Sequence, residues 1–408
     1  MSHDNITRRN VLKSAATGAT VGLWGLGAKS GLAGKTPSPL RILDPVHGAV
    51  LNHRHGKQSD DGLSISVSGE TPSGSRVTVN GVPCRVEGKR FDAKVVLREP
   101  ETDLTVVAEE GGRQYGDRAR VIWDRYSVPR YRFSIDDNSF FLRDIAQKNY
   151  KSLFECFYLK MLRELHKKYG VKYTLNIYYT AADDAKFATD ADFKLPQFPD
   201  RYKGEFRDNA DWLRLAFHAY ANMPNRPYEF ATPEKLIADL DLVTNEIHRF
   251  AGEEAYAPPT VIHFGLTPHS AFKPLYDHGV RVLSGYFVKS GDTWDVNYRW
   301  DAVHSEYVSR HNAWKDFQSG MVFSRISIVC NSFPVDRIAG VLEPLAKDPN
   351  TAEIMDLFTH EQYFWPFYFH YIPDHPQRIE TAIRWVTERG YKPVFFHEGF
   401  LGGRPLCG

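Results

Sequence analysis

The chain has 408 residues, with 51 Lys and Arg against 50 Asp and Glu, so its formal net charge is +1. This near balance argues against a nucleic-acid or other polyanion binder that works through bulk charge. Hydrophobic residues make up 42% and charged residues 25%, which excludes a mainly disordered or fibrous protein. The four cysteines are too few for a disulfide framework, and no two have metal-knuckle spacing.

Residues 1–33 resemble a twin-arginine export signal. Arg8 and Arg9 precede Asn-Val-Leu-Lys, and a weakly apolar run then extends to Ala33. The run is too short and too mildly apolar for a stable membrane span, and it ends in small residues that suit cleavage. We therefore expect a periplasmic or secreted protein that the twin-arginine translocase exports. The alternative is a tail that happens to hold two arginines.

Residues 41–123 contain short stretches of alternating apolar and polar residues, such as Leu63–Val67 and Leu104–Val107. Turn signals separate these stretches, among them Asn80-Gly81. This pattern predicts an all-β sandwich. It resembles the bacterial immunoglobulin-like modules that accompany carbohydrate enzymes, which implies a role in spacing or packing beside a catalytic domain.

Residues 131–400 alternate between strand and helix patterns. Helical periodicity predicts helices at Lys151–Tyr169, Thr232–Gly252 and His375–Gly390. The candidate strands are Arg132–Asp136, Val171–Tyr179, Trp212–His218, Thr260–Phe264, Val280–Phe287, Met321–Val329, Glu353–Thr359 and Lys392–Phe396. Up to eight strands alternating with helices predict an α/β fold, an irregular (β/α) barrel. A doubly wound open sheet is the alternative, but the chain has no Gly-rich phosphate loop to support it.

A (β/α) barrel gathers its chemistry at the carboxyl ends of its strands. Five candidate strands lead into Asp, His or Glu side chains, namely Asp136-Asp137, His218, His263, His360-Glu361 and His397-Glu398. One such His is more often structural, but several at one rim favour function. Asp, His and His together suit a divalent metal of the zinc type, which activates water and polarises a carbonyl group.

The sequence Phe-Ser-Ile-Asp-Asp that ends at Asp137 resembles the Thr-Phe-Asp-Asp motif of the polysaccharide deacetylases of the NodB-homology type. The resemblance covers residues 131–400. It implies an irregular (β/α) barrel and a divalent metal, often zinc. It also implies removal of acetyl groups from amino sugars or acetylated glycans, with Asp136 as general base and Asp137 as metal ligand.

The other motifs of that family are matched in part. The second, His-Ser/Thr-x-x-x-His, begins at His218 but has Asn222 where the second metal-binding His belongs. His263 is our candidate for the missing ligand, because it ends the next expected strand. The last motif supplies a catalytic acid, and it is matched loosely by the Phe-Phe-His sequence that ends at His397. Glu361 is a second candidate for this acid.

Substrate contacts are expected from aromatic and polar residues of the same region. The candidates are Trp212, Arg226, Tyr228, His360 and Trp365. The leading hypothesis is an exported metal-dependent hydrolase that removes acyl groups, as amides or esters, from a glycan. Two alternatives remain open. One is a metal-independent glycoside hydrolase with a carboxylate pair such as Asp136 and Glu361, and the other is a non-catalytic glycan-binding protein.

Overall fold

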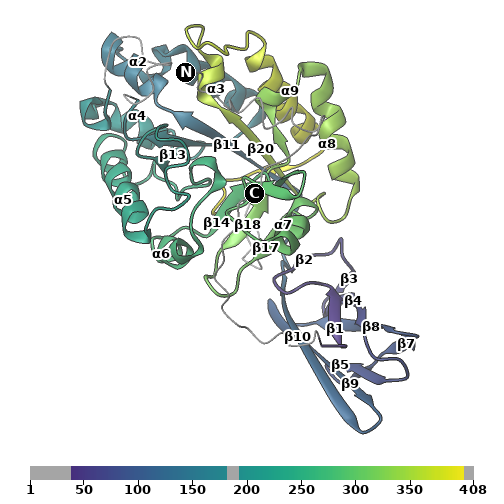
Figure 1. Cartoon of the computed structure of the whole chain (residues 1–408). Helices are drawn as coiled ribbons and strands as arrows, with labels where there is room; N and C mark the ends of the chain where they lie inside the picture. The colour runs from purple at the N-terminus through teal and green to yellow at the C-terminus, as the bar shows by residue number, and fades with distance from the viewer. Residues whose placement is uncertain (1–37, 182–192, 399–408) are drawn as a thin grey trace. The chain divides into compact units, whose positions relative to one another are not determined.

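The computed structural model describes residues 38–181 and 193–398, so the predicted export signal in residues 1–33 lies outside the described residues. The described chain forms two compact units (Figure 1). The first consists chiefly of the chain up to Arg125, and the second chiefly of the chain from Tyr126 onward. Across the described ranges, no helix has both the length and the apolar character that a membrane crossing requires.

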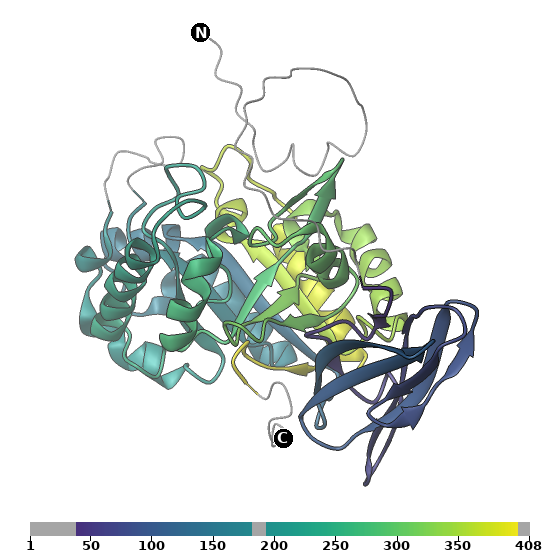
Figure 2. The same cartoon turned by 60° about the horizontal axis from the view of Figure 1, so that its bottom comes forward.

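The first unit is built from strands, and its described residues include no helix (Figure 2). One five-stranded sheet has the order β1-β4-β8-β7 with β3 beside β4, and the other has the order β2-β10-β9-β5-β6. The strands are β1 (Arg41–Asp44), β2 (Val50–Leu51), β3 (Lys57–Ser59), β4 (Gly62–Glu70), β5 (Arg76–Val79), β6 (Val82–Pro83), β7 (Arg85–Glu87), β8 (Arg90–Leu97), β9 (Glu101–Glu110) and β10 (Arg113–Trp123). Alternate residues of β8 are buried, as expected for a strand with one face on a core.

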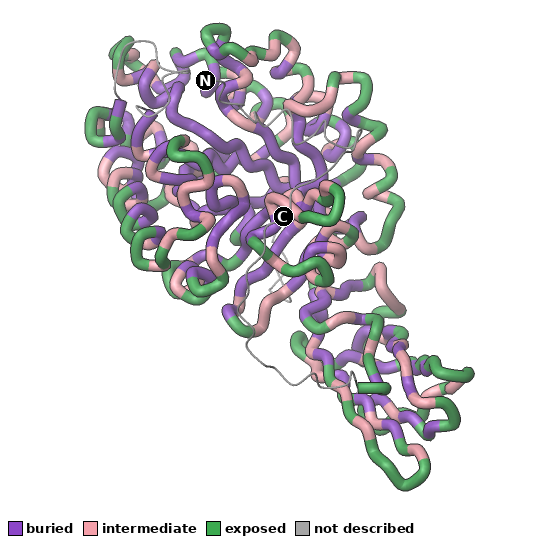
Figure 3. Tube along the Cα trace, in the orientation of Figure 1, coloured by how far each residue is buried: buried purple, intermediate pink, exposed green. Residues whose placement is uncertain are grey.

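The second unit is organised around a six-stranded parallel sheet of order β13-β12-β11-β20-β19, with β21 beside β11. The strands are β11 (Arg130–Asn138), β12 (Tyr173–Tyr178), β13 (Leu213–Ala219), β19 (Ile328–Val329), β20 (Ile354–His360) and β21 (Lys392–Pro393). Every residue of β11 and β12 is buried (Figure 3). Burial on both faces is typical of parallel sheets. Because the strands run parallel, their carboxyl ends lie at one edge of the sheet.

Eight described α-helices belong to this unit. They are α2 (Phe140–Lys148), α3 (Phe157–Tyr169), α4 (Lys203–Asp208), α5 (Pro233–Phe250), α6 (Phe272–Asp277), α7 (Ala302–Ser309), α8 (Ile338–Lys347) and α9 (His375–Glu388). The three predicted helices are confirmed as α3, α5 and α9. Thr232 caps α5 by accepting a hydrogen bond from the Lys235 N–H, and Pro233 occupies its first turn. Helix α5 lies beside β13, and α9 lies beside β20 (Figure 1).

The prediction of an irregular (β/α) barrel is wrong, because the second unit is a mixed α/β arrangement of separate sheets. A three-stranded sheet contains β14 (Val282–Gly285), β18 (Val322–Arg325) and β17 (Ala313–Lys315), and β17 runs antiparallel to β18. A two-stranded ribbon contains β15 (Val288–Ser290) and β16 (Thr293–Asp295). Among the described strands, no pairing joins either edge of the six-stranded sheet to these smaller sheets.

The segment Thr260–Phe264, which we expected to be a strand, is not one. Pro258 and Pro259 lack the N–H groups that a ladder beside β13 would need at this point. The segment then turns into the short 3-10 helix η4 (His263–Gly265). It makes one ladder-like bond, from the Ser284 N–H to the Thr260 carbonyl at 2.7 Å, and forms no continuous pairing.

Candidate metal centre

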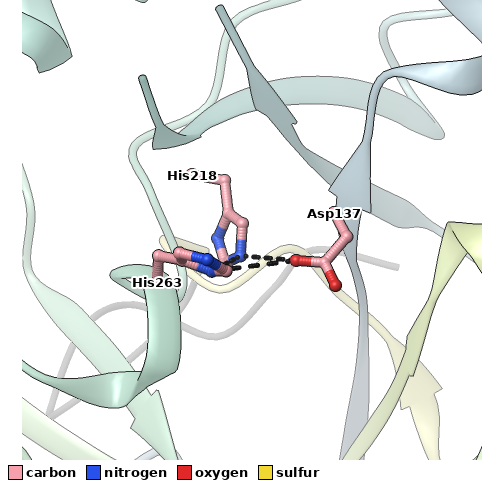
Figure 4. Close-up of side chains that lie close together, drawn as sticks. All are labelled: Asp137, His218 and His263. Carbon is pink, nitrogen blue, oxygen red and sulfur yellow. Dashed lines mark hydrogen bonds and ion pairs between the residues drawn. The ribbon is translucent and has the colours of Figure 1, made fainter. Parts of the chain in front are cut away.

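Asp137, His218 and His263 converge at the carboxyl edge of the six-stranded sheet (Figure 4). Asp137 Oδ1 lies 3.2 Å from His218 Nε2 and 3.7 Å from His263 Nδ1. The two imidazole nitrogens are 3.0 Å apart. All three side chains are buried, and one ligand atom from each lies within 4.8 Å of the others. This group of one carboxylate and two imidazoles can hold a metal ion.

The backbone at the end of β11 directs both aspartates to this edge. Successive residues of a regular strand point to opposite faces, but the pairing of β11 with β12 changes register between Ile135 and Asn138. Asp137 there adopts a left-handed conformation with a φ of 62°. Asp is one of the few residues that tolerate this conformation, and such strain concentrates at functional sites. As a result Asp136 Oδ2 also lies close to the cluster, 3.6 Å from His218 Nε2.

His263 reaches the cluster from the tight turn η4. Phe264 and Gly265 both have positive φ values, 65° and 60°. A Cβ at Gly265 would lie 2.8 Å from the Val296 side chain, so this position requires glycine. The turn that replaced the expected strand is therefore the feature that points His263 toward His218.

Backbone carbonyl groups fix the tautomers of both histidines. His218 Nδ1 lies 3.2 Å from the Val261 carbonyl oxygen, and His263 Nε2 lies 3.3 Å from the Asn222 carbonyl oxygen. A carbonyl oxygen only accepts hydrogen bonds, so each of these ring nitrogens carries the proton. The lone pairs of His218 Nε2 and His263 Nδ1 then face Asp137 Oδ1. Imidazoles oriented in this way are typical of metal ligands, and the residues present fit a divalent cation.

Two residues that the sequence analysis did not single out bind Asp137. The Tyr178 hydroxyl donates a hydrogen bond to Oδ1 and lies 3.1 Å from Asn222 Oδ1. Gln362 Nε2 donates to Asp137 Oδ2 at 2.8 Å. Tyr178 is the last residue of β12, and Gln362 follows the end of β20 by two residues. In the sequence, the available signal for these two residues was their position at, or directly after, the end of a strand.

A buried polar network holds Asp136. Asn176 Nδ2 lies 2.6 Å from Asp136 Oδ1 and contacts the hydroxyl groups of Ser134 and Thr260 at 2.8 and 2.7 Å. Asp136 and Asn176 are almost completely buried. The amide thus fixes one carboxylate oxygen of Asp136, and the other oxygen faces His218.

A small pocket opens over Asp137, and its interior volume of about 10 Å³ is room for roughly one water molecule. Its lining consists of Asp137, Ser139, Phe140, Tyr178, Ala181, Asn222 and Gln362. Apart from Asp137, the polar groups of this lining are uncharged hydroxyl and amide groups. The pocket therefore places a space of about one water molecule beside Asp137, among uncharged polar groups.

Glu361, a candidate catalytic acid, lies outside the cluster and binds the first turn of α2. Its Oε2 accepts hydrogen bonds from the N–H groups of Ser139 and Phe140 at 2.7 and 2.9 Å. Its Oε1 accepts from the Phe141 N–H at 2.6 Å and from Trp365 Nε1 at 3.1 Å. Complete burial raises the pKa of this carboxyl to about 7, although the four donors act to lower it. These contacts make Glu361 a cap of α2.

His397, the other candidate acid, lies near the amino end of β13 instead of at its carboxyl end. Its Nε2 is 3.1 Å from the Arg214 guanidinium. Arg214 is the second residue of β13, whereas His218 is the sixth. This separation corresponds to roughly 13 Å along the strand.

The five expected substrate contacts are not part of the pocket lining. Trp212, Tyr228 and Trp365 are buried. Trp212 stacks on His166 with 4.6 Å between ring centroids, and the Tyr228 hydroxyl donates to Asp239 at 2.9 Å.

The remaining two expected contacts are more accessible. Arg226 pairs with Asp295 at 3.1 Å, and His360 Nδ1 lies 3.0 Å from Asn331 Oδ1. The pocket instead presents Tyr178, Asn222 and Gln362.

The fold and the cluster define a mixed α/β protein with a candidate metal centre at the carboxyl edge of its parallel sheet. The sequence matches no protein-family model and no curated protein. Among solved structures, it is similar at 10% identity and a TM-score of 0.15 to a sialyltransferase from Photobacterium damsela. The match covers 78% of this chain and 56% of that one, so it spans little more than half of that structure. A TM-score this low does not establish a shared fold.

Proposed function

We propose that this protein is a metal-dependent hydrolase that removes an acyl group from a carbohydrate. The observation that carries the proposal is the convergence of Asp137 Oδ1, His218 Nε2 and His263 Nδ1 beside a second buried carboxylate, Asp136. Zinc suits this set of donors. A bound divalent metal would supply an activated water and a polarised substrate carbonyl.

In this proposal Asp136 acts as general base. Asn176 occupies Oδ1 at 2.6 Å, while Oδ2 lies 3.6 Å from the imidazole nitrogen of His218 that faces the cluster. Oδ2 can therefore accept the proton of the attacking water. Asp137 serves a different purpose, as a metal ligand. Its Oδ1 lies 3.2 Å from His218 Nε2, and its Oδ2 accepts a hydrogen bond from Gln362.

The carbohydrate and the acyl group in this proposal rest on the resemblance of residues 133–137 to the deacetylase motif. Export from the cell likewise rests on the N-terminal sequence alone.

The hydrogen bonds of Glu361 favour this proposal over a metal-independent glycoside hydrolase. Such an enzyme needs two carboxylates that face each other across the scissile bond. Both oxygens of Glu361 instead accept hydrogen bonds from the α2 backbone and Trp365. The pair Asp136 and Glu361 therefore lacks the geometry that this alternative requires.

Release of acetate from acetylated chitin oligosaccharides and acetylated xylan tests the proposal. We expect a chelator to abolish the release by the full chain and zinc to restore it. Asp137→Asn and Asp136→Asn should each lower kcat/KM at least about 100-fold, and only Asp137→Asn should also lose the metal. Asp336→Asn is the matched control, because Asp336 is exposed and the chemical change is the same. Acetate release that ignores the chelator, or cleavage of glycosidic bonds without acetate release, would contradict the proposal.

A further inference from the structure

The segment that carries His263 lacks the continuous strand pairing that would hold it beside the sheet. Residues 260–264 form no strand, and the Thr260 carbonyl makes their one ladder-like bond. Both candidate imidazoles nevertheless depend on this segment. His263 belongs to it, and the Val261 carbonyl oxygen lies 3.2 Å from His218 Nδ1. Side-chain contacts are therefore needed to fix the segment against β11 and β12.

Buried hydrogen bonds at Thr260 supply this anchor. The Thr260 hydroxyl accepts a hydrogen bond from Asn176 Nδ2 on β12 at 2.7 Å and lies 2.8 Å from the Ser134 hydroxyl on β11. The Thr260 N–H donates to Asn176 Oδ1 at 3.5 Å. All three residues are buried, so water does not compete for these contacts. The Asn176 amide thus binds Thr260 through both of its ends.

Asp136 fixes the orientation of the Asn176 amide. Nδ2 donates to Asp136 Oδ1 at 2.6 Å, and a hydrogen bond to a carboxylate is stronger than one between neutral groups. Turning the amide over would place two acceptors against each other. Burying an amide inside a parallel sheet costs free energy unless it is hydrogen-bonded. The amide of Asn176 meets this requirement by joining Asp136 to the segment that carries His263.

We propose that Asn176 is a positioning residue that links the general base to the metal centre. Through Thr260 it fixes the segment that holds His263 and the carbonyl group that orients His218. Through the same amide nitrogen it holds Asp136. The role of Asp136 in this inference rests on the proposed function, whereas the role of Thr260 does not. One buried amide thereby takes the place of the backbone pairing that the segment lacks.

Zinc affinity tests the link to the metal centre without reference to catalysis. Zinc binding to the full chain is measured by competition with a chelating dye for the wild type, Asn176→Leu, Thr260→Val and the double variant. Asn176→Leu removes the amide, and Thr260→Val removes only a hydroxyl group. We expect each single change to weaken zinc binding about 10- to 100-fold. Because both changes break one contact, the double variant should bind zinc at most about 2-fold more weakly than Asn176→Leu.

Thr359→Val is the matched control. Thr359 is also buried, and its hydroxyl lies 2.8 Å from His375 Nε2, outside the candidate metal centre. We expect this variant to keep the zinc affinity of the wild type, and thermal unfolding of each metal-free variant shows whether it is folded. Wild-type zinc affinity in Asn176→Leu or Thr260→Val, an equal loss in Thr359→Val, or losses that multiply in the double variant would overturn the inference.

Acetate release from acetylated chitin oligosaccharides at saturating zinc tests the link to the base. We expect Asn176→Leu to lower kcat about 10-fold and to have no further effect in the Asp136→Asn background, because the amide acts through that carboxylate. An equal effect in both backgrounds would overturn this link. The predicted losses of zinc affinity in a protein that releases no acetate would refute the proposed hydrolase and leave the link to the metal centre standing. Zinc-dependent acetate release with unchanged zinc affinity in both single variants would do the reverse.

Discussion

Asp137 combines a charged side chain with a left-handed backbone conformation. Two substitutions can therefore separate its contribution to metal binding from its contribution to stability. Asn tolerates the φ of 62° nearly as well as Asp, whereas Ala does not. We expect Asp137→Asn to lower zinc affinity at least about 100-fold, because it removes a negatively charged ligand, while the stability of the metal-free protein changes little. Asp137→Ala should lose the metal as well and should cost about 1 kcal/mol more in the free energy of unfolding.

Zinc titration and urea unfolding of the two variants check this prediction. Zinc binding by Asp137→Asn at wild-type strength would remove Asp137 from the metal centre.

Tyr178 is not a candidate metal ligand, but it contacts the ligand atom Asp137 Oδ1. Its hydroxyl donates to Asp137 Oδ1 and lies 3.4 Å from His263 Nδ1. Hydrogen bonds of this kind orient metal ligands, and their loss typically costs about 10- to 100-fold in metal affinity. Tyr178→Phe should therefore weaken zinc binding about 10-fold, measured by competition with a chelating dye. Tyr179→Phe is the control, since Tyr179 stacks on Tyr220 and has no place in the pocket lining. An equal effect of both variants would count against a role for the Tyr178 hydroxyl.

The sequence predicted the three candidate ligands but not the groups that orient them. His218 and His263 were found because each directly follows an apolar stretch, and Asp137 because it belongs to the Asp-Asp pair after the first expected strand. Tyr178 and Gln362 were missed because Tyr and Gln after a strand carry no chemical signal until the neighbouring strand is known. Their role depends on the three-dimensional distance to Asp137.

At the level of elements, Glu361 holds the first turn of α2, the helix that directly follows the two aspartates, through hydrogen bonds from its backbone. The folded-state pKa of Glu361 is about 7, against an ordinary value of 4.5. The folded protein therefore holds this proton to higher pH than the unfolded chain does. The contribution of the group to stability is complete below about pH 4.5 and is lost as the pH rises toward 7.

Comparison with Glu361→Gln isolates this effect. In metal-free protein, the free energy of unfolding of the wild type minus that of the variant should fall by about 3 kcal/mol between pH 4.5 and pH 7. Denaturant unfolding across this range measures the difference. A difference that is constant, or that grows with pH, would show that burial does not raise the pKa of Glu361.

Single elements were predictable where local signals agree. The Thr232 cap, the proline after it and the periodic Leu and Ile residues fix α5 without reference to the rest of the chain. Thr260–Phe264 has the apolar composition of a strand, but two prolines and a left-handed turn override it. Apolar content alone does not distinguish a strand from a buried irregular segment.

At the scale of the whole second unit, a buried ion pair joins the six-stranded sheet to the three-stranded sheet. Arg132 on β11 binds Asp356 on β20, and both bind the Ser324 hydroxyl on β18. Arg132 and Asp356 are each 1% exposed. Barrel closure was predicted from strand count. The sheets meet through these side chains and through isolated backbone hydrogen bonds, such as the one from the Ser327 N–H to the Asp356 carbonyl at 2.9 Å. The order of strands along the chain cannot reveal such contacts.

Removing one partner of this pair leaves an unpaired buried charge. Asp356→Asn should destabilise the protein by about 3–5 kcal/mol, whereas Arg132→Met combined with Asp356→Leu should recover much of that loss. Denaturant unfolding of the three proteins measures both effects. A double variant as unstable as Asp356→Asn would mean that the pair stabilises the unit beyond the cost of burying it.

The most direct test of the account is the zinc content per chain of protein purified without an affinity metal, measured by elemental mass spectrometry. We predict close to one equivalent of a divalent metal in the wild type, retained in His278→Ala and lost in His218→Ala. A wild-type protein that holds no metal, even after incubation with zinc, cobalt, nickel or manganese, would contradict the assignment of Asp137, His218 and His263 as a metal centre and with it the proposed hydrolase.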